Sequence, residues 1–329
     1  MGIWDFWKAE AKDYLFGQLD AKQGPSGISV APIVKDKAYV QVILRRMRIV
    51  NIRLATKKLY GAVHSDLGLL HQSGSVVTFK QLIAPPELKD VESSSLDRTI
   101  ISNQPILGPT PYRGSALQLN LALVSVVSAD LAGPYLEVLS GLASAAGVSF
   151  VSAAQPFLKP LTSGIDLLTG VKGASMREIQ VVSNLDPLQT GIFVVMRATK
   201  NDLKLSDLRV AADYSLQYAD GQPVTKYPYM VISIEASPDR NDWMGIPELK
   251  TAYAEVADAV KRDKPDEYQE AMSVFRRTAL LNGDLLFDHA KQLVAQVKVR
   301  MDELMGPTLT SSADAPKQIP ALASFNPFQ

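Results

Sequence analysis

The sequence predicts an α+β protein: a mainly antiparallel, β-sandwich-like body with a small helical insert, an N-terminal amphipathic helix and a C-terminal helical region. Strand-like segments come in runs rather than alternating with long helices. The last third of the chain instead repeats apolar residues at the period of a helix. We therefore expect a helix over 1–22, a β-rich domain over 28–236 with its insert at about 131–172, a helical region over 240–306 and a flexible tail over 307–329.

The first element is predicted from one apolar stripe at steps of three and four residues. The stripe consists of Trp4, Trp7, Ala11, Tyr14 or Leu15, and Leu19. Trp4, Phe6 and Trp7 put three large aromatic side chains within two helical turns. Such a helix has three possible uses: it folds back onto its own domain, it docks in a groove of another subunit, or it lies in a membrane interface.

Alternation and apolar runs predict the strands. Lys37–Leu54 is rich in Val, Ile and Tyr. In Leu117–Val126 four leucines at every second position share one face, which is the period of a half-buried strand. Gly191–Arg197 is an apolar run typical of a fully buried strand.

A hairpin is the sharpest local prediction. The segments Leu208–Tyr218 and Tyr227–Glu235 both have strand character, and Asp220-Gly221 lies between them. An Asp-Gly pair favours the tight turn of a hairpin. We therefore expect the two segments to pair with each other.

The segment Val138–Leu158 contains no charged residue and is long enough to cross a bilayer. About half of its residues are Ala, Ser or Gly, which gain little from transfer into lipid. We favour a close-packed insert beside the sheet over a membrane span. A segment that is hidden in one form and released into a membrane or a partner is the third interpretation.

Three helices are expected in the C-terminal region. Pro247 opens the first, and Pro265 opens the second, which Asn282-Gly283 closes. Asp284 is expected to cap the third, which ends at Gly306-Pro307. The short connections favour antiparallel packing.

The composition argues against several kinds of chemistry. Lys and Arg balance Asp and Glu, so the formal net charge is zero and nucleic acid is a disfavoured partner. Cysteine is absent, and the three histidines, His64, His71 and His289, have no metal-ligand spacing. Phosphate-binding and dinucleotide-binding loops and a nucleophile elbow are also absent from the sequence. We therefore expect no catalytic residue, no metal site and no cofactor.

A basic run lies in the first long strand segment and continues beyond it. It consists of Arg45, Arg46, Arg48, Arg53, Lys57 and Lys58. Strict alternation puts Arg46 and Arg48 on one face and Arg45 with Arg53 on the other. The run is either a solvated face or a contact for an anionic partner, through Arg46, Arg48 and Arg53.

The tail ends with two phenylalanines, Phe325 and Phe328, in an otherwise polar segment. They plug a pocket of this chain or of a neighbour, or they belong to an ordinary frayed end. Asn326-Pro327-Phe328 also matches a short docking motif.

The sequence as a whole predicts a non-enzymatic, cytoplasmic protein-interaction or structural subunit of a homo- or hetero-oligomeric assembly. Its partners are proteins, with self-association favoured. The alternative is a membrane-associating protein, peripheral or pore-forming, that meets an anionic membrane surface through Trp4, Trp7 and the basic strand. A hydrolase without a linear motif is the third candidate.

Overall fold

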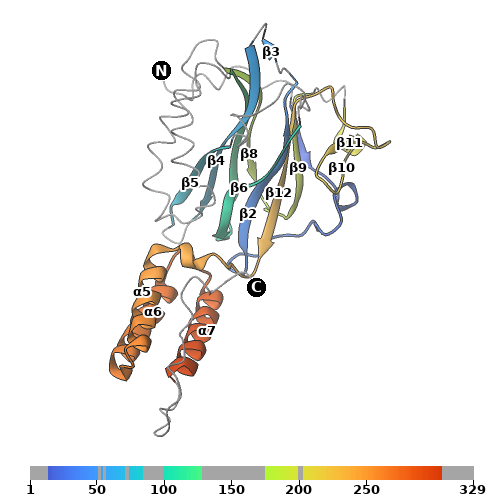
Figure 1. Ribbon diagram of the computed structural model, residues 1–329. Coiled ribbons are helices and arrows are strands. Elements are labelled where there is room, and N and C mark those ends of the chain that lie inside the picture. The colour runs from blue at the N-terminus through green and yellow to red at the C-terminus, as the bar shows by residue number, and fades with distance from the viewer. Residues whose placement is uncertain are drawn as a thin grey trace.

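The computed structural model describes residues 14–50, 53–54, 57–70, 74–83, 99–127, 175–198 and 203–305. Antiparallel sheets form the body, and three long helices follow them in the chain (Figure 1). This confirms the predicted α+β class with a sheet body and C-terminal helices. The predicted insert at about 131–172, the segment 138–158 and the tail 307–329 lie outside the described residues.

The body is a sandwich of two sheets whose neighbouring strands are all antiparallel. The first sheet, in spatial order, consists of β1 (Leu15–Gln18), β9 (Gly191–Met196), β12 (Tyr229–Ser237), β2 (Tyr39–Arg48) and β6 (Thr99–Pro111). The second sheet has the order β3-β4-β7-β8, and β5 also pairs with β4. Its strands are β3 (Arg53–Leu54), β4 (Lys57–Leu70), β5 (Val76–Ile83), β7 (Leu117–Val127) and β8 (Ser175–Leu185).

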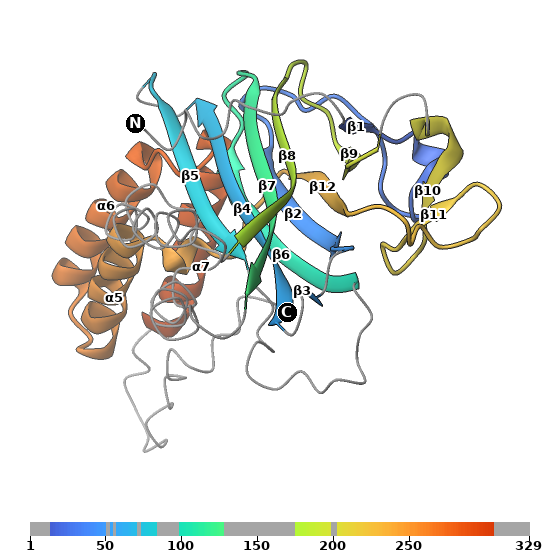
Figure 2. The ribbon, with the colours of Figure 1, turned by 90° about the horizontal axis from the view of Figure 1, so that it is seen from above.

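The main core lies between the two sheets, which Figure 2 shows as two layers. Strand β7 faces it with Leu117, Leu119, Leu121 and Leu123, each at most 1% exposed, while Gln118 on the other face is exposed. This confirms the alternation predicted for that segment. Each such leucine contributes about 1.5–3 kcal/mol relative to an exposed position.

Strand β9 confirms the predicted continuous burial, since all six of its residues are buried. It lies between β1 and β12 in the sheet, with the sandwich core on one face and a second apolar cluster on the other. A strand covered on both faces needs apolar residues at every position.

The prediction of a helix over residues 1–22 is wrong for the part of this range that the structure describes. Leu15–Gln18 is strand β1, followed by the short 3-10 helix η1 (Ala21–Gln23). Strand β1 pairs antiparallel with β9, with Leu15 opposite Met196 and Gln18 opposite Phe193. The edge of β9 supplies hydrogen bonds and apolar neighbours that outweigh the local helical period. Residues 1–13 lie outside the described part of the chain.

The predicted hairpin is confirmed at its turn, where Gln217 pairs with Pro223, but it is wrong in its long arms. The turn at Asp220-Gly221 exists, with Gly221 at φ 91°, but the strand after it does not pair with the strand before it. Instead β11 (Leu216–Tyr218) pairs with β10 (Leu208–Val210), and β12 lies between β9 and β2. An apolar strand such as β12 buries more surface in the middle of a sheet than in a two-stranded ribbon.

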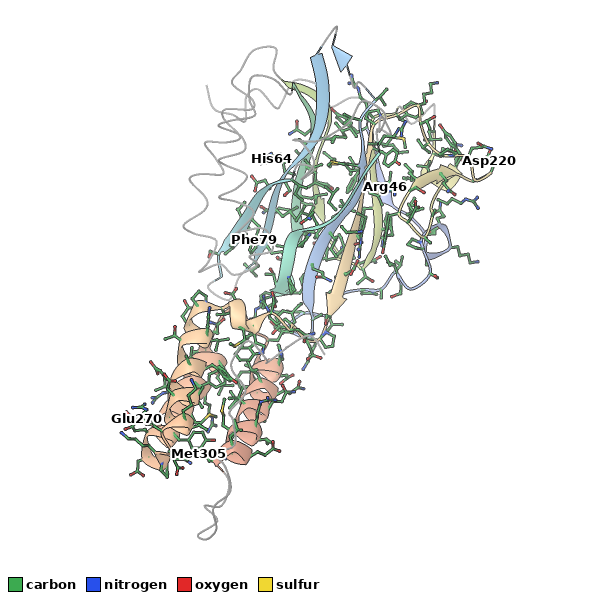
Figure 3. All side chains as sticks on the ribbon, viewed as in Figure 1. Arg46, His64, Phe79, Asp220, Glu270 and Met305 are labelled. Atoms are coloured by element: carbon green, nitrogen blue, oxygen red, sulfur yellow. The ribbon has the colours of Figure 1, made fainter. Side chains whose placement is uncertain are left out.

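Residues 203–228 form what we call the outer lobe. It contains the 3-10 helix η4 (Leu205–Asp207) and the strands β10 and β11. Its buried residues, among them Leu208, Leu216 and Val224, pack on Ile192, Val194 and Val231 of the first sheet. Figure 3 places Asp220 at the outer tip of this lobe, away from the sandwich.

The three predicted C-terminal helices are present and form a bundle at one end of the sandwich (Figure 1). After the 3-10 helix η5 (Trp243–Gly245) come α5 (Pro247–Lys261), α6 (Pro265–Leu281) and α7 (Phe287–Met305). The prediction that Asp284 caps the third helix is wrong. Helix α7 begins three residues later, and Asp284 is buried in the loop before it, because that loop packs against the sandwich.

Candidate interaction surface

The structure places three of the eight residues predicted to contact a partner. The other five lie outside the described residues: Trp4, Phe6, Trp7, Phe325 and Phe328. Arg53 lies in β3, opposite Lys58 of β4. Arg46 and Arg48 lie near the end of β2, and both are only 8% exposed.

A bulge in β2 rearranges the basic run. The register between β2 and β12 pairs Arg46 with Val231 but Leu44 with Ile232, so Arg45 is an extra residue in β2. Arg45 and Arg46 therefore both point to the face covered by the outer lobe, and Arg48 does the same. The prediction that Arg45 faces away from Arg46 and Arg48 is wrong, because strict alternation fails at a bulge.

The outer lobe supplies partners for all three arginines. Arg45 lies over the ring of Tyr214, 4.6 Å from its centre. The Arg46 Nη1 atom is 3.3 Å from the Asp213 carboxylate, and Arg48 donates a 3.3 Å hydrogen bond to the carbonyl of Thr225. The arginines thus fasten the lobe to the sheet.

Arg45 also joins the lobe to the sheet's own polar residues. It donates a 2.8 Å hydrogen bond to the Ser233 hydroxyl and a 3.2 Å hydrogen bond to the Asn103 side chain, and it pairs with Glu235. Tyr214, over whose ring Arg45 lies, has a φ of 62°. That backbone conformation costs a bulky residue about 1–3 kcal/mol, so the surrounding contacts must hold it.

The charged groups of this cluster interact with one another rather than with solvent. Hydrogen bonds from Ser215, and then the charge of Arg46, lower the pKa of Asp213 below its usual range. The buried guanidinium groups of Arg46 and Arg48 present little surface to an outside anion. The cluster therefore acts as an internal fastening of the outer lobe.

A polar junction fixes the bundle on the sandwich. Tyr39 of β2 is 1% exposed, and its hydroxyl accepts a 2.8 Å hydrogen bond from the Leu286 amide. The same oxygen is 2.7 Å from Nδ1 of His289 on α7. When the proton of the neutral imidazole is on Nε2, Nδ1 accepts, and the Tyr39 hydroxyl donates to it. Burial raises the pKa of Tyr39 to about 12, so this hydroxyl stays protonated.

Two arginines complete the junction. Arg240 is 2% exposed, and two of its guanidinium nitrogens donate hydrogen bonds of 2.7 and 2.9 Å to the Asp242 carboxylate. Its third nitrogen donates a 3.0 Å hydrogen bond to the Asp284 carbonyl. Arg113 pairs with Asp36 at 2.9 Å and donates to the carbonyls of Gly283 and Leu285. Sequence reasoning missed this network because its partners are far apart in the chain; Tyr39 and His289 are 250 residues apart.

The junction predicts an acid-sensitive stability. Burial lowers the pKa of His289 below 6.5, opposed by Asp239 and Asp242 and assisted by Arg240. Below pH 6.5 the unfolded chain therefore binds more protons than the folded one, and the free energy of unfolding falls as the pH falls. We expect thermal unfolding to show a loss of stability as the pH falls through and below 6.5, and His289→Gln should reduce this loss.

Glutamine keeps an acceptor for the Tyr39 hydroxyl but does not titrate. The slope of stability against pH is compared between the His289→Gln chain and the unchanged chain in the same buffers. Equal slopes for the His289→Gln chain and the unchanged chain would show that the junction does not sense protons.

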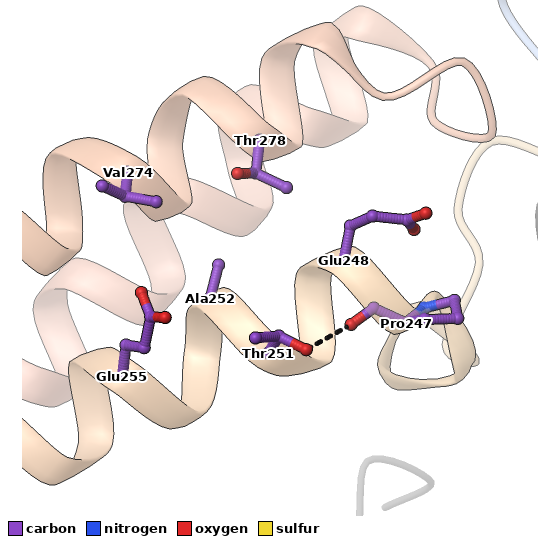
Figure 4. Close-up of a pocket in the computed structure, with 7 residues that line it drawn as sticks. All are labelled: Pro247, Glu248, Thr251, Ala252, Glu255, Val274 and Thr278. Atoms are coloured by element: carbon purple, nitrogen blue, oxygen red, sulfur yellow. Dashed lines mark hydrogen bonds between the residues drawn. The ribbon is translucent and has the colours of Figure 1, made fainter.

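The bundle carries an open groove between α5 and α6. It has a volume of about 400 Å³ and is lined by Pro247, Glu248, Thr251, Ala252, Glu255, Val274 and Thr278. Figure 4 shows Ala252 and the two glutamates on the side of α5 that faces Val274 and Thr278. Helix α7 contributes Leu293 and Val297 to the buried core of the bundle, so it packs against α5 and α6 elsewhere.

Exposed aliphatic side chains also occur on the bundle. Leu281 at the end of α6 is 78% exposed, and Val299 on α7 is 59% exposed. Within the described ranges no helix is both long and apolar enough to cross a membrane, and no three metal-ligating side chains gather. The groove is a concave feature of the described residues that could receive a segment of another chain.

No protein family, curated protein or solved structure with which the chain was compared matches it. Function is accordingly inferred from the geometry of the described residues.

Proposed function

We propose that this protein is a non-enzymatic interaction or structural subunit that assembles with copies of itself. The observation that carries the proposal is the open α5/α6 groove, whose floor includes Ala252 and Val274 and whose rim carries Glu248 and Glu255. A groove with an apolar floor and a charged rim is suited to an amphipathic helix. The sandwich holds this bundle in a fixed position through Tyr39, which supports a structural role.

The chain ends provide the second part of the proposal. We assign the aromatic residues Trp4, Phe6 and Trp7, and the tail residues Phe325 and Phe328, as further connectors between subunits. Large aromatic side chains are the usual anchors of protein interfaces. Arg46 and Arg48 are not assigned this role, because both are engaged within the chain.

The solution mass tests this function. Size-exclusion chromatography with light scattering is expected to show an oligomer for the full chain and a smaller particle for chains that begin at Tyr14 or end at Met305. Beginning at Tyr14 keeps β1 in the first sheet, whereas beginning after β1 would expose the edge of β9.

Thermal unfolding is the control for these shortened chains. Both are expected to unfold at the temperature of the full chain, because the removed residues precede β1 or follow α7. A full chain that is monomeric at every concentration would refute self-assembly.

A further inference from the structure

The rim of the groove has a defined charge pattern. Glu248 and Glu255 are seven residues apart on α5, which is two helical turns or about 10 Å, and Ala252 lies between them. Both glutamates are exposed, and neither has an ion-pair partner among the described residues. Figure 4 shows the three side chains on one side of α5.

Helix α7 repeats this pattern with the opposite charge. Lys291 and Lys298 are also seven residues apart, and Ala295 occupies the same position between them as Ala252 does on α5. All three are exposed. Val299, next along this face, is 59% exposed and adds apolar surface. Helix α5 therefore carries two acidic residues with an alanine between them, and α7 carries two basic residues with an alanine at the same spacing.

These lysines have only weak local partners. Lys298 forms an exposed ion pair with Asp302, whose carboxylate also accepts a hydrogen bond from Tyr268 of α6, and Lys291 lies 4.3 Å from the centre of the Phe287 ring. Exposed pairs of this kind contribute little to stability, so exchanging them for a partner's carboxylates costs little.

The two surfaces of one molecule are not positioned to meet. The buried residues of α7, Ala290, Leu293, Val297 and Met301, face α5 and α6. Lys291, Ala295 and Lys298 lie on the exposed side of α7, beside its contact with α6, where Asp302 accepts a hydrogen bond from Tyr268. The α7 surface that fills the groove therefore has to belong to another molecule.

We propose that the Lys291–Lys298 face of α7 in one copy docks in the α5/α6 groove of a second copy, with lysines against Glu248 and Glu255 and Ala295 against Ala252. This inference rests on the proposed self-assembly and names its surfaces. Because the two surfaces differ, the contact is head-to-tail, and each copy can bind two neighbours. The assembly then grows with concentration and weakens with salt.

Charge reversal tests the pairing. The chains Glu248→Lys/Glu255→Lys and Lys291→Glu/Lys298→Glu are each expected to raise the dissociation constant for self-association roughly tenfold or more, because like charges would face each other. An equimolar mixture of the two chains is expected to associate again. The chain with all four substitutions should do the same. Sedimentation velocity over a concentration series measures all of these.

The matched control is Lys250→Glu/Lys261→Glu, which reverses two exposed charges on the opposite flank of α5 and should leave association unchanged. If the unchanged chain associates but either groove or α7 reversal has no effect, the docking is wrong while self-assembly stands. The same holds if the mixture does not associate. A monomeric unchanged chain overturns both the docking and the proposed function.

Discussion

A Phe275→Ala chain is expected to lose about 3–5 kcal/mol of its free energy of unfolding. Phe275 is 0% exposed at the centre of the bundle. Its ring meets those of Trp243 and Tyr253 edge-on, with centroids 6.1 and 6.2 Å away. Such aromatic pairs add about 0.5–1.5 kcal/mol each beyond burial, and alanine removes both pairs and leaves a cavity.

Urea unfolding followed by helical circular dichroism measures this loss. Leu281→Ala at the end of α6 is the control, since an exposed aliphatic position should change stability by no more than about 0.5 kcal/mol. A Phe275→Ala chain as stable as the control would mean that this aromatic cluster does not hold the bundle together. The same substitution should also abolish the groove, because Val274 and Thr278 lie on the same helix.

An Arg240→Ala chain is expected to lose about 3 kcal/mol, near the low end for breaking a buried pair. Alanine leaves the Asp284 carbonyl without this donor and uncovers the ring of Tyr39. The loss is at the low end because the Asp242 side chain is 33% exposed and can regain water. The bundle should then loosen from the sandwich before the sandwich unfolds.

Amide hydrogen exchange locates this effect. The Leu286 amide donates to the Tyr39 hydroxyl, so its exchange should speed up more than that of amides in β7. Arg276→Ala removes an exposed arginine from α6 and should change neither exchange nor stability appreciably. Uniform acceleration in β7 and at Leu286 would show that sandwich and bundle unfold as one unit.

Local patterns were enough for part of this fold. The leucines of β7 alternate because one side of a strand faces the core, and that period is visible in any sequence window. Pro247 and Pro265 open helices because a proline at the first turn lacks only an N–H that has no helical partner. The sheet body and the C-terminal helices follow from such signals.

The candidate site was predictable only in part. The basic character of β2 is evident from its sequence, but the bulge at Arg45 is not, and it decides which arginines share a face. The α5/α6 groove has no sequence signal of its own. It is formed by the packing of α5 against α6, although the repeated spacing of Glu248–Glu255 and Lys291–Lys298 was present in the sequence.

The sequence by itself determined the class of the fold, the buried faces of β7 and β9, and the starts of α5 and α6, because each depends on neighbours within a few residues. Tertiary structure alone decided that Leu15–Gln18 is a strand, that β12 pairs with β2 and β9, and that Tyr39 meets His289. These contacts join segments far apart in the chain. Their free energy comes from shared burial and hydrogen bonding, which a local period does not encode.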